Sequence, residues 1–290
     1  MKITDMLTAS RQMLSFEVFP PKTETVFKSV SEAALQVAAL HPDFISVTYG
    51  AGGGTSQYTL DLAREIHEKT GVEPLAHLTC VSSSRETVRA RIEEIHSAGI
   101  QNVMALRGDP PVDGVPGTDY HHASDLITEL RASGYDFCIG GACYPEVHPE
   151  SENQKADIAA LREKARVGCD FLTTQMFFDN HLLFNFLYKI REAGITIPVF
   201  PGIMPITSKK QVKQVMRLSN ASLPQRFRSL MDRYGDSEEA MCQAGIIYAT
   251  DQIIDLYANG IQVVHVYTMN KPAIAAAIKQ NLSVIIGMPL

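Results

Sequence analysis

The stretch Ser97–Gly108, "SAGIQNVMALRG", carries the pattern on which the fold prediction depends. A helical segment ends at Gly99, and a short apolar run of strand-like length and composition follows at once. Helices commonly end with a glycine in the left-handed conformation, because glycine has no Cβ to clash there. The same unit recurs after five other glycines along the chain: Gly71, Gly134, Gly168, Gly194 and Gly260.

Two more strand-like segments, "LSFEVFP" (residues 14–20) and "LHPDFISVTYG" (residues 40–50), bring the number of units to eight. Strands are expected to begin near residues 14, 44, 74, 102, 137, 171, 197 and 262. Eight strand–helix units predict an α/β fold, a (β/α)8 TIM barrel. We expect residues 1–290 to form a single catalytic domain without an appended regulatory domain. An open doubly wound sheet is the alternative, although its first turn is often Gly-rich and Pro20-Pro21 follow the first strand here.

The stretches between the strands show helical periodicity. In residues 85–98 apolar side chains recur on one face, and Ser83 with Glu86 predicts a capping box at the helix start. The interval before the last strand is longer than the others. There, "SLPQRFRSLMDRYG" (residues 222–235) and "SEEAMCQAGIIYATDQIIDLYA" (residues 237–258) predict extra helix.

Composition restricts the class of protein. With 290 residues, 45% hydrophobic and 20% charged, the chain is long enough to bury a large core. The net charge of −6 argues against a nucleic-acid partner, which usually meets a basic stripe. The N-terminus lacks the apolar core of a signal peptide, and no apolar run reaches membrane-spanning length. Five cysteines without CxxC spacing fit reduced thiols, so we expect a soluble, cytoplasmic protein without a membrane partner.

Six of the strands alternate between an apolar and a polar face. A purely structural barrel fills its interior with Val, Ile and Leu, whereas barrel enzymes carry their chemistry at the carboxyl ends of the strands. Glu17 in particular is a carboxylate in an aromatic strand, a costly place for a charge without a role. We therefore predict an enzyme with polar groups inside the barrel mouth; the alternative is a set of satisfied core polar residues. The expected inward residues are Ser15, Glu17, Phe19, Ser46, Thr48, His77, Thr79, Ala105, Arg107, Asp109, Thr173, Gln175, Phe177, His265 and Tyr267.

Local motifs exclude several kinds of site. "TYGAGGGTS" (residues 48–56) lacks the last glycine of GxGxxG and is interpreted as a loop above the mouth. His77, Cys80, Cys143 and His148 do not have zinc-ligand spacing, so no metal site is expected. No GxSxG motif appears and no lysine lies within a strand, which weakens a Schiff-base mechanism. A barrel lyase or aldolase acting on a small phosphorylated substrate remains an alternative, as does a non-catalytic binding protein.

Eight pieces, in this order, resemble the methylenetetrahydrofolate reductase family: "FEVFPPK", "FISVTYGAGG", "HLTC", "ALRGDPP", "YPEVHPE", "TQMFFD", "PGIMPI" and "VYTMNK". They extend from residue 16 to residue 271, so the resemblance covers nearly the whole chain. It implies a (β/α)8 flavoprotein that uses FAD to pass a hydride from NADH or NADPH to methylenetetrahydrofolate. The product would be 5-methyltetrahydrofolate, in the one-carbon metabolism that supplies methionine synthesis. A homo-oligomer is expected from the family.

The resemblance also implies roles for individual residues. Glu17 would be the general acid for opening the folate's five-membered ring, a step that a carboxylic acid performs best when burial raises its pKa. Asp109 would contact the pterin and favour the cationic iminium. Thr48 and Gln175 would meet the nicotinamide or the folate in turn. The substrate side would also include Gln211, Tyr267 and Lys271. The residues implied for FAD are Tyr49, Ala51, His77, Arg107, Gly108, Asp109, Ala123, Tyr144, His148, Asp157 and Lys164.

Four positions depart from residues found in other members of the family. Arg is found there at the position of Lys271, Asn at that of Ala160, Arg at that of Glu163 and Tyr at that of His122. Lysine lacks the bidentate fork of arginine, so the contact with the folate carboxylate is expected to differ. The contacts near the adenine end of FAD are expected to differ as well.

Overall fold

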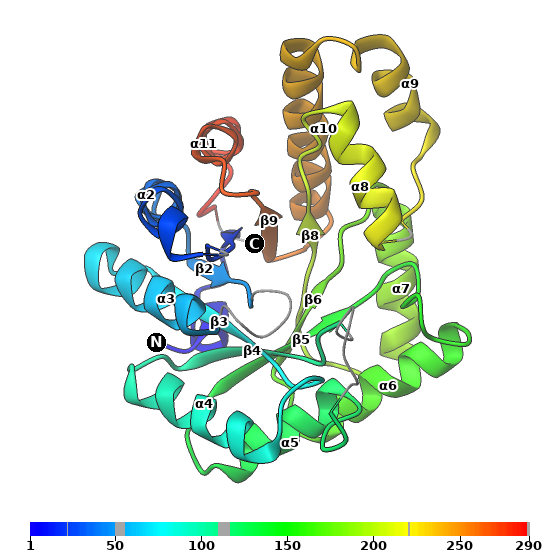
Figure 1. Cartoon of the computed structure of the whole chain (residues 1–290). Helices are drawn as coiled ribbons and strands as arrows, with labels where there is room; N and C mark the ends of the chain where they lie inside the picture. Colours follow the sequence, from blue (N-terminus) through cyan, green and yellow to red (C-terminus); the bar gives the residue numbers. More distant parts are fainter. Residues whose placement is uncertain (22, 50–55, 110–116, 220, 289–290) are drawn as a thin grey trace.

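Parallel strands form one continuous sheet in the computed structural model, which describes residues 1–21, 23–49, 56–109, 117–219 and 221–288 (Figure 1). Within these residues there are nine strands. They are β1 (Met13–Val18), β2 (Phe44–Val47), β3 (Glu73–Thr79), β4 (Asn102–Leu106), β5 (Cys138–Cys143), β6 (Phe171–Thr174), β7 (Val199–Phe200), β8 (Gly202–Ile203) and β9 (Val263–Tyr267). All the pairings between them are parallel.

The sheet closes on itself at Pro201. Its order is β7-β6-β5-β4-β3-β2-β1-β9-β8, so β7 and β8 lie at the two ends. Only Pro201 separates these two strands in the chain, and its carbonyl accepts a hydrogen bond of 2.9 Å from His265 N on β9. β7 and β8 are therefore two halves of one strand, and the sheet is an eight-membered barrel. The predicted TIM barrel and the predicted strand positions are confirmed.

Helices surround the barrel (Figure 1). All six glycines predicted to end helices have positive φ, between 70° at Gly71 and 108° at Gly168. Among the described residues, every helix is too short or too polar to span a lipid bilayer. The helices are α1 (Ile3–Met6), η1 (Leu7–Ala9), η2 (Glu24–Val26), α2 (Phe27–Ala38), α3 (Ser56–Thr70), α4 (Arg85–Ser97), α5 (Ala123–Ala132), α6 (Gln154–Arg166), α7 (Asn180–Glu192), α8 (Lys209–Ser219), α9 (Gln225–Tyr234), α10 (Glu238–Ala258) and α11 (Pro272–Asn281).

The extra helix predicted before the last strand is present as α9 and α10, with α8 before them. These three helices share a separate apolar cluster that includes Val215, Phe227 and Tyr248, and they lie together at one side of the molecule (Figure 1). The predicted capping box of α4 is wrong by one position. Ser84, not Ser83, is the N-cap, and its Oγ accepts from Thr87 N at 3.2 Å.

The barrel interior is apolar at one end and polar at the other. At the amino ends of the strands, side chains such as Phe44, Phe171 and Phe200 fill the interior, and Ile3 of α1 packs among them. Ile3 N also donates to Asn102 Oδ1 at 2.8 Å, so the N-terminal segment closes this end. The next inward residues toward the carboxyl ends include the buried polar residues Ser15, Ser46 and His77, so polar side chains line this half of the interior.

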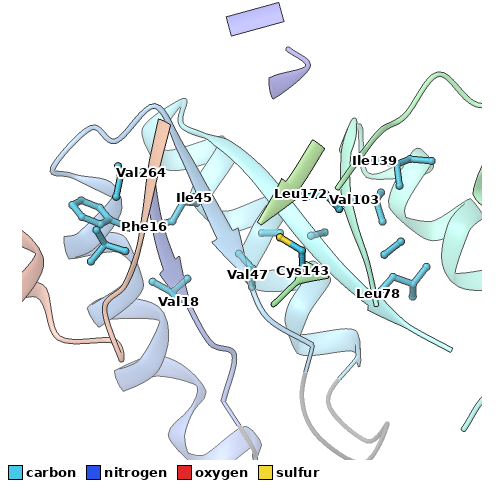
Figure 2. Packing of buried hydrophobic residues seen from close by; sticks show 14 of the residues in the cluster. Phe16, Val18, Ile45, Val47, Leu78, Val103, Ile139, Cys143, Leu172 and Val264 are labelled. Carbon is cyan, nitrogen blue, oxygen red and sulfur yellow. The ribbon is translucent and has the colours of Figure 1, made fainter. Parts of the chain in front are cut away.

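The outward side chains pack against the helices, as the alternation predicted for most strands. Phe16 and Val18 of β1 lie beside Ile45 and Val47 of β2 in the large core cluster (Figure 2). The expected inward direction was wrong for Phe177 after β6, which lies in the outer cluster, and for the face assigned to β4. Ala105 belongs to this outer cluster, whereas Met104 and Leu106 belong to the interior. Arg107 follows the last residue of β4, so the turn after the strand, rather than the strand's alternation, determines its direction.

Candidate active site

Glu17 and two histidines form the centre of the mouth; we call Glu17, His77 and His265 the acid–histidine cluster. Glu17 is on β1, and its side chain is 21% exposed. Its Oε2 lies 3.6 Å from His265 Nε2 on β9 and 3.8 Å from His77 Nε2 on β3. Three strands thus direct ionisable groups toward one carboxylate oxygen, so the grouping predicted from face alternation is confirmed.

Hydrogen bonds to serines orient both imidazoles. One bond of 2.6 Å joins Ser46 Oγ to His77 Nε2, and one of 2.8 Å joins Ser15 Oγ to His265 Nδ1. Burial lowers the pKa of His77 to about 4, although the charge of Glu17 acts in the opposite direction. His77 is therefore uncharged at neutral pH and does not form an ion pair with Glu17 there.

Tyr267 lies next to this cluster and is fixed by close packing. Its hydroxyl donates to the carbonyl oxygen of Thr174 at 2.5 Å. Burial, and next the charge of Glu17, raises the pKa of Tyr267 well above its usual value. A Cβ at Gly202 would collide with the Tyr267 hydroxyl and would lie 2.5 Å from the Thr174 oxygen. Glycine in "PGIM" therefore makes room for the tyrosine.

A second group, the basic rim cluster, consists of Arg107, Tyr144, His148 and Lys164. Arg107 directs both terminal nitrogens at Glu150, with Nη1–Oε2 and Nη2–Oε1 distances of 2.5 and 2.7 Å. This hydrogen bonding raises the pKa of Arg107. The rings of Tyr144 and His148 meet edge to face, 4.5 Å between centroids. Burial lowers the pKa of His148; the charges of Glu150 and Asp157 act against this shift, and those of Arg107 and Lys164 add to it.

Helix α6 supplies the other side of this rim. Lys164 Nζ donates to the carbonyl oxygen of Ala142 at 2.7 Å, and burial lowers the pKa of this lysine. Asp157 is buried and accepts from Ser151 Oγ at 3.1 Å and His148 N at 3.3 Å, which fixes the loop between β5 and α6. The rim therefore combines two cations and two aromatic rings from the turn after β4, the loop after β5 and helix α6.

A third group, the amide–lysine cluster, consists of Thr207, Gln211 and Lys271. Gln211 Oε1 accepts from Thr207 N at 3.0 Å, and Lys271 Nζ donates to Thr207 Oγ1 at 3.3 Å. The loop before α8 and the turn after β9 thus meet at Thr207. The two residues expected on the outer part of the folate, an amide and an ammonium group, thus both contact Thr207.

The remaining predicted residues lie around the mouth with fewer contacts. Thr48 N donates to Val18 O at 3.0 Å, which places Thr48 beside the end of β1, with Tyr49 half-buried after it. Gln175 follows β6, and its N donates to Cys143 O at 2.7 Å. Asp109 is exposed, and its charge raises the pKa of Arg107 and Tyr144. Ala123 is the first residue of α5, and Ala51 lies outside the described residues.

Sequence reasoning missed Glu150 and Thr207 as site residues. Each makes its contact through a loop, where no periodicity indicates direction. Glu150 belongs to the quoted "YPEVHPE" motif, which was the signal available for it. A separate cavity of about 180 Å³ lies at the amino ends of β7 and β9, and Leu7, Leu187, Phe200 and other residues line it. It contains none of the three clusters, so the chemistry of the mouth, not cavity size, identifies the site.

Comparison with known proteins gives consistent matches. The sequence profile of the family described as "Methylenetetrahydrofolate reductase" matches residues 2–283. "Methylenetetrahydrofolate reductase (NADH) 1" of Zea mays is 36% identical over 98% of this chain and 50% of its own length. The chain therefore spans about half the length of such plant relatives. "5,10-methylenetetrahydrofolate reductase" of Escherichia coli (strain K12) is 34% identical over 95% of this chain and 92% of its own length.

A solved structure has the same fold. It is an uncharacterized protein from Clostridium thermocellum, whose description says that it binds two copies of 5-methyl-5,6,7,8-tetrahydrofolic acid. The TM-score is 0.66 at 15% identity, over 98% of this chain and 99% of that one. At this identity the likeness concerns the fold alone.

Proposed function

Because the chain belongs to the methylenetetrahydrofolate reductase family, we propose that it reduces 5,10-methylenetetrahydrofolate to 5-methyltetrahydrofolate with electrons from NADH. The observation that carries this proposal is the half-buried Glu17 with two imidazole nitrogens within 3.8 Å of one carboxylate oxygen. Such a grouping suits proton donation to a substrate at the carboxyl-end mouth of a barrel. Family membership favours this activity over a lyase or a non-catalytic binding protein. The plant relatives named for NADH support that co-substrate over NADPH.

The basic rim cluster fits FAD as the resident cofactor. A dinucleotide carries an anionic diphosphate, and Arg107 and Lys164 are cations near one another on this rim. The turn after β4 is left-handed at Gly108 (φ 84°), where a Cβ would lie 3.0 Å from Thr79 Cβ. A side chain there would crowd the base of the rim, so glycine keeps this turn close to the barrel. Arg107, Tyr144, His148 and Lys164 would hold FAD, with Tyr49, His77, Ala123 and Asp157 around it.

When bound, FAD would supply the two-electron chemistry, accepting a hydride from NADH and giving one to the folate. The protein's part is proton transfer and orientation. The folate's methylene group bridges two nitrogens, and it must open to an iminium before it can accept a hydride. Glu17 would give its proton to the leaving nitrogen as that C–N bond breaks. The hydride then reduces the iminium to a methyl group, which balances one proton and two electrons.

Substrate binding is assigned to the other residues of the mouth. Gln211 and Lys271, which meet at Thr207, would hold the polar outer part of the folate through an amide and a cation. Thr48 and Gln175 at the ends of β2 and β6 would contact the nicotinamide and the pterin in turn. Asp109 would contact the pterin from the rim, where its negative charge favours the iminium, and Tyr267 would pack against the substrate from β9.

The test is product formation. Purified protein supplied with FAD, NADH and methylenetetrahydrofolate should form 5-methyltetrahydrofolate, measured by chromatography, with one NADH consumed per product. Equal or better rates with NADPH would overturn the choice of co-substrate. An absence of the methyl product with both nucleotides would overturn the proposed function.

We further propose that residues 1–290 act as one catalytic domain in a reducing, cytoplasmic compartment, where the product supplies methionine synthesis. The five cysteines are all free, which supports a reducing environment. A homo-oligomer is proposed from the family, and light scattering of the purified protein would measure it.

A further inference from the structure

The turn after β9 has an unusual backbone and returns over the exit of β1. Met269 and Asn270 have φ values of 54° and 52°, so both adopt the left-handed conformation. Asparagine accepts this conformation more readily than most residues, whereas an unbranched apolar side chain such as methionine gains nothing from it. Two such residues in succession indicate that tertiary contacts hold the turn in place.

Asn270 makes those contacts with a single residue, Phe19. Its Oδ1 accepts from Phe19 N, and its Nδ2 donates to Phe19 O, both at 2.9 Å. We call this pair of hydrogen bonds the Asn270 clasp. The regular pairing of β1 with β9 ends at Glu17 and Tyr267. The clasp therefore continues the ladder beyond the strands, with a side chain in place of backbone.

Thr268 holds the residue that matters most for the proposed chemistry. Its Oγ1 donates to the carbonyl oxygen of Glu17 at 2.6 Å. Thr268 thus holds Glu17, and Asn270 holds Phe19. The two contacts are spaced two residues apart along each segment, which is the spacing of side chains on one face of a β-strand. Pro20 follows Phe19 and has no N–H, so Phe19 offers the last backbone donor before the Pro-Pro turn.

The same turn ends in the amide–lysine cluster. Lys271, directly after Asn270, donates to Thr207. One segment of four residues therefore joins the proton donor, the exposed ring of Phe19 at the mouth, and the group proposed to hold the outer part of the folate. Loss of the contact between this segment and Phe19 would let Glu17 move relative to a substrate held at Lys271.

We propose that Asn270 is a positioning residue for the folate half-reaction: through Phe19 it fixes the exit of β1 and so the placement of the Glu17 carboxyl against the substrate. This inference rests on the proposed function. Asn270 acts through the backbone and needs no contact with the substrate. Its removal should affect the half-reaction that uses the Glu17 proton and spare the one in which NADH reduces the flavin.

The test compares Asn270→Gly with Met269→Gly. Glycine accepts the left-handed conformation, so Asn270→Gly removes the clasp without adding strain. Met269→Gly loosens the same turn while leaving the clasp intact, and it is the matched control. Two measurements are made: amide hydrogen exchange at Phe19 in the protein without ligands, and the two half-reactions by anaerobic stopped flow.

Asn270→Gly should speed exchange at Phe19 by about tenfold, because Phe19 N loses its acceptor. It should slow flavin reoxidation by methylenetetrahydrofolate by about 10- to 100-fold, the scale of a small misplacement of a catalytic group. Flavin reduction by NADH should stay within about twofold of wild type in both variants.

Unchanged exchange at Phe19, an equal loss in both half-reactions, or the same effect from Met269→Gly would overturn the inference. If the wild type is reduced by NADH but is not reoxidised by the folate, the proposed function fails. In that case exchange at Phe19 alone would still decide whether the clasp exists.

Discussion

Replacing Glu17 with glutamine removes a proton donor while keeping the shape of the side chain. Glu17 Oε2 lies 3.6 and 3.8 Å from the two imidazole nitrogens, beyond ordinary hydrogen-bond distance. Glutamine therefore loses no short hydrogen bond, and the free energy of unfolding should change by less than about 1 kcal/mol. A loss of activity in Glu17→Gln can then be attributed to chemistry rather than to misfolding.

The magnitude follows from the step that loses its acid. General acid catalysis contributes about 10²- to 10⁴-fold, which corresponds to about 3 to 5 kcal/mol of barrier. In anaerobic stopped flow, Glu17→Gln should slow flavin reoxidation by methylenetetrahydrofolate by that factor. Reduction of the flavin by NADH needs no proton from Glu17 and should change by less than about threefold.

The control is Glu24→Gln, which makes the same chemical change at an exposed position seven residues along the chain. It should leave both half-reactions at wild-type rates. Equal damage to both half-reactions in Glu17→Gln would refute the assignment, and so would reoxidation at the wild-type rate.

Three further outcomes are expected. Glu150→Gln should tighten FAD binding about threefold in a fluorescence titration of apoprotein, because Glu150 occupies both terminal nitrogens of Arg107. The control is Glu163→Gln, which breaks a similar pair with Arg166 on α6. Weaker FAD binding in Glu150→Gln would contradict the prediction. His77 has a folded pKa of about 4 against 6.5 for the free side chain, so the folded protein binds fewer protons between these values. The free energy of unfolding should therefore fall by about 3 kcal/mol as the pH drops from 6.5 to 4. In His77→Gln the free energy of unfolding should depend less on pH over this range. An unchanged pH dependence would show that His77 does not cause it. Gly202→Ala should lower the free energy of unfolding in urea by about 1 to 3 kcal/mol, because the new methyl group meets Tyr267 and Thr174. Wild-type stability would contradict this prediction, because it would mean that Tyr267 and Thr174 move aside without cost.

Much of the fold follows from local rules that act within a few residues. A left-handed residue at the end of a helix is most often glycine, so Gly71 and Gly260 marked the starts of strands correctly. Alternation also identified the inward direction of Glu17, His77 and His265, because each lies within a regular strand. These three were predictable as a group for that reason.

Rules of alternation fail where a strand ends. Arg107 follows β4, and Ala105 before it faces the helices, so the arginine reaches the rim through a turn that alternation does not describe. The contacts of Glu150 and Asn270 are bonds between loops far apart in sequence. Such bonds depend on how the barrel closes, which no local pattern encodes.

Flavin-dependent reduction of methylenetetrahydrofolate is the reaction proposed for the polar mouth of this barrel. Anaerobic titration of the FAD-loaded protein tests it most directly, through the visible absorbance of the flavin. We expect NADH to bleach the flavin and methylenetetrahydrofolate then to restore its colour, with one equivalent of 5-methyltetrahydrofolate formed. A protein that binds no flavin, or a reduced flavin that the folate does not reoxidise, would contradict it.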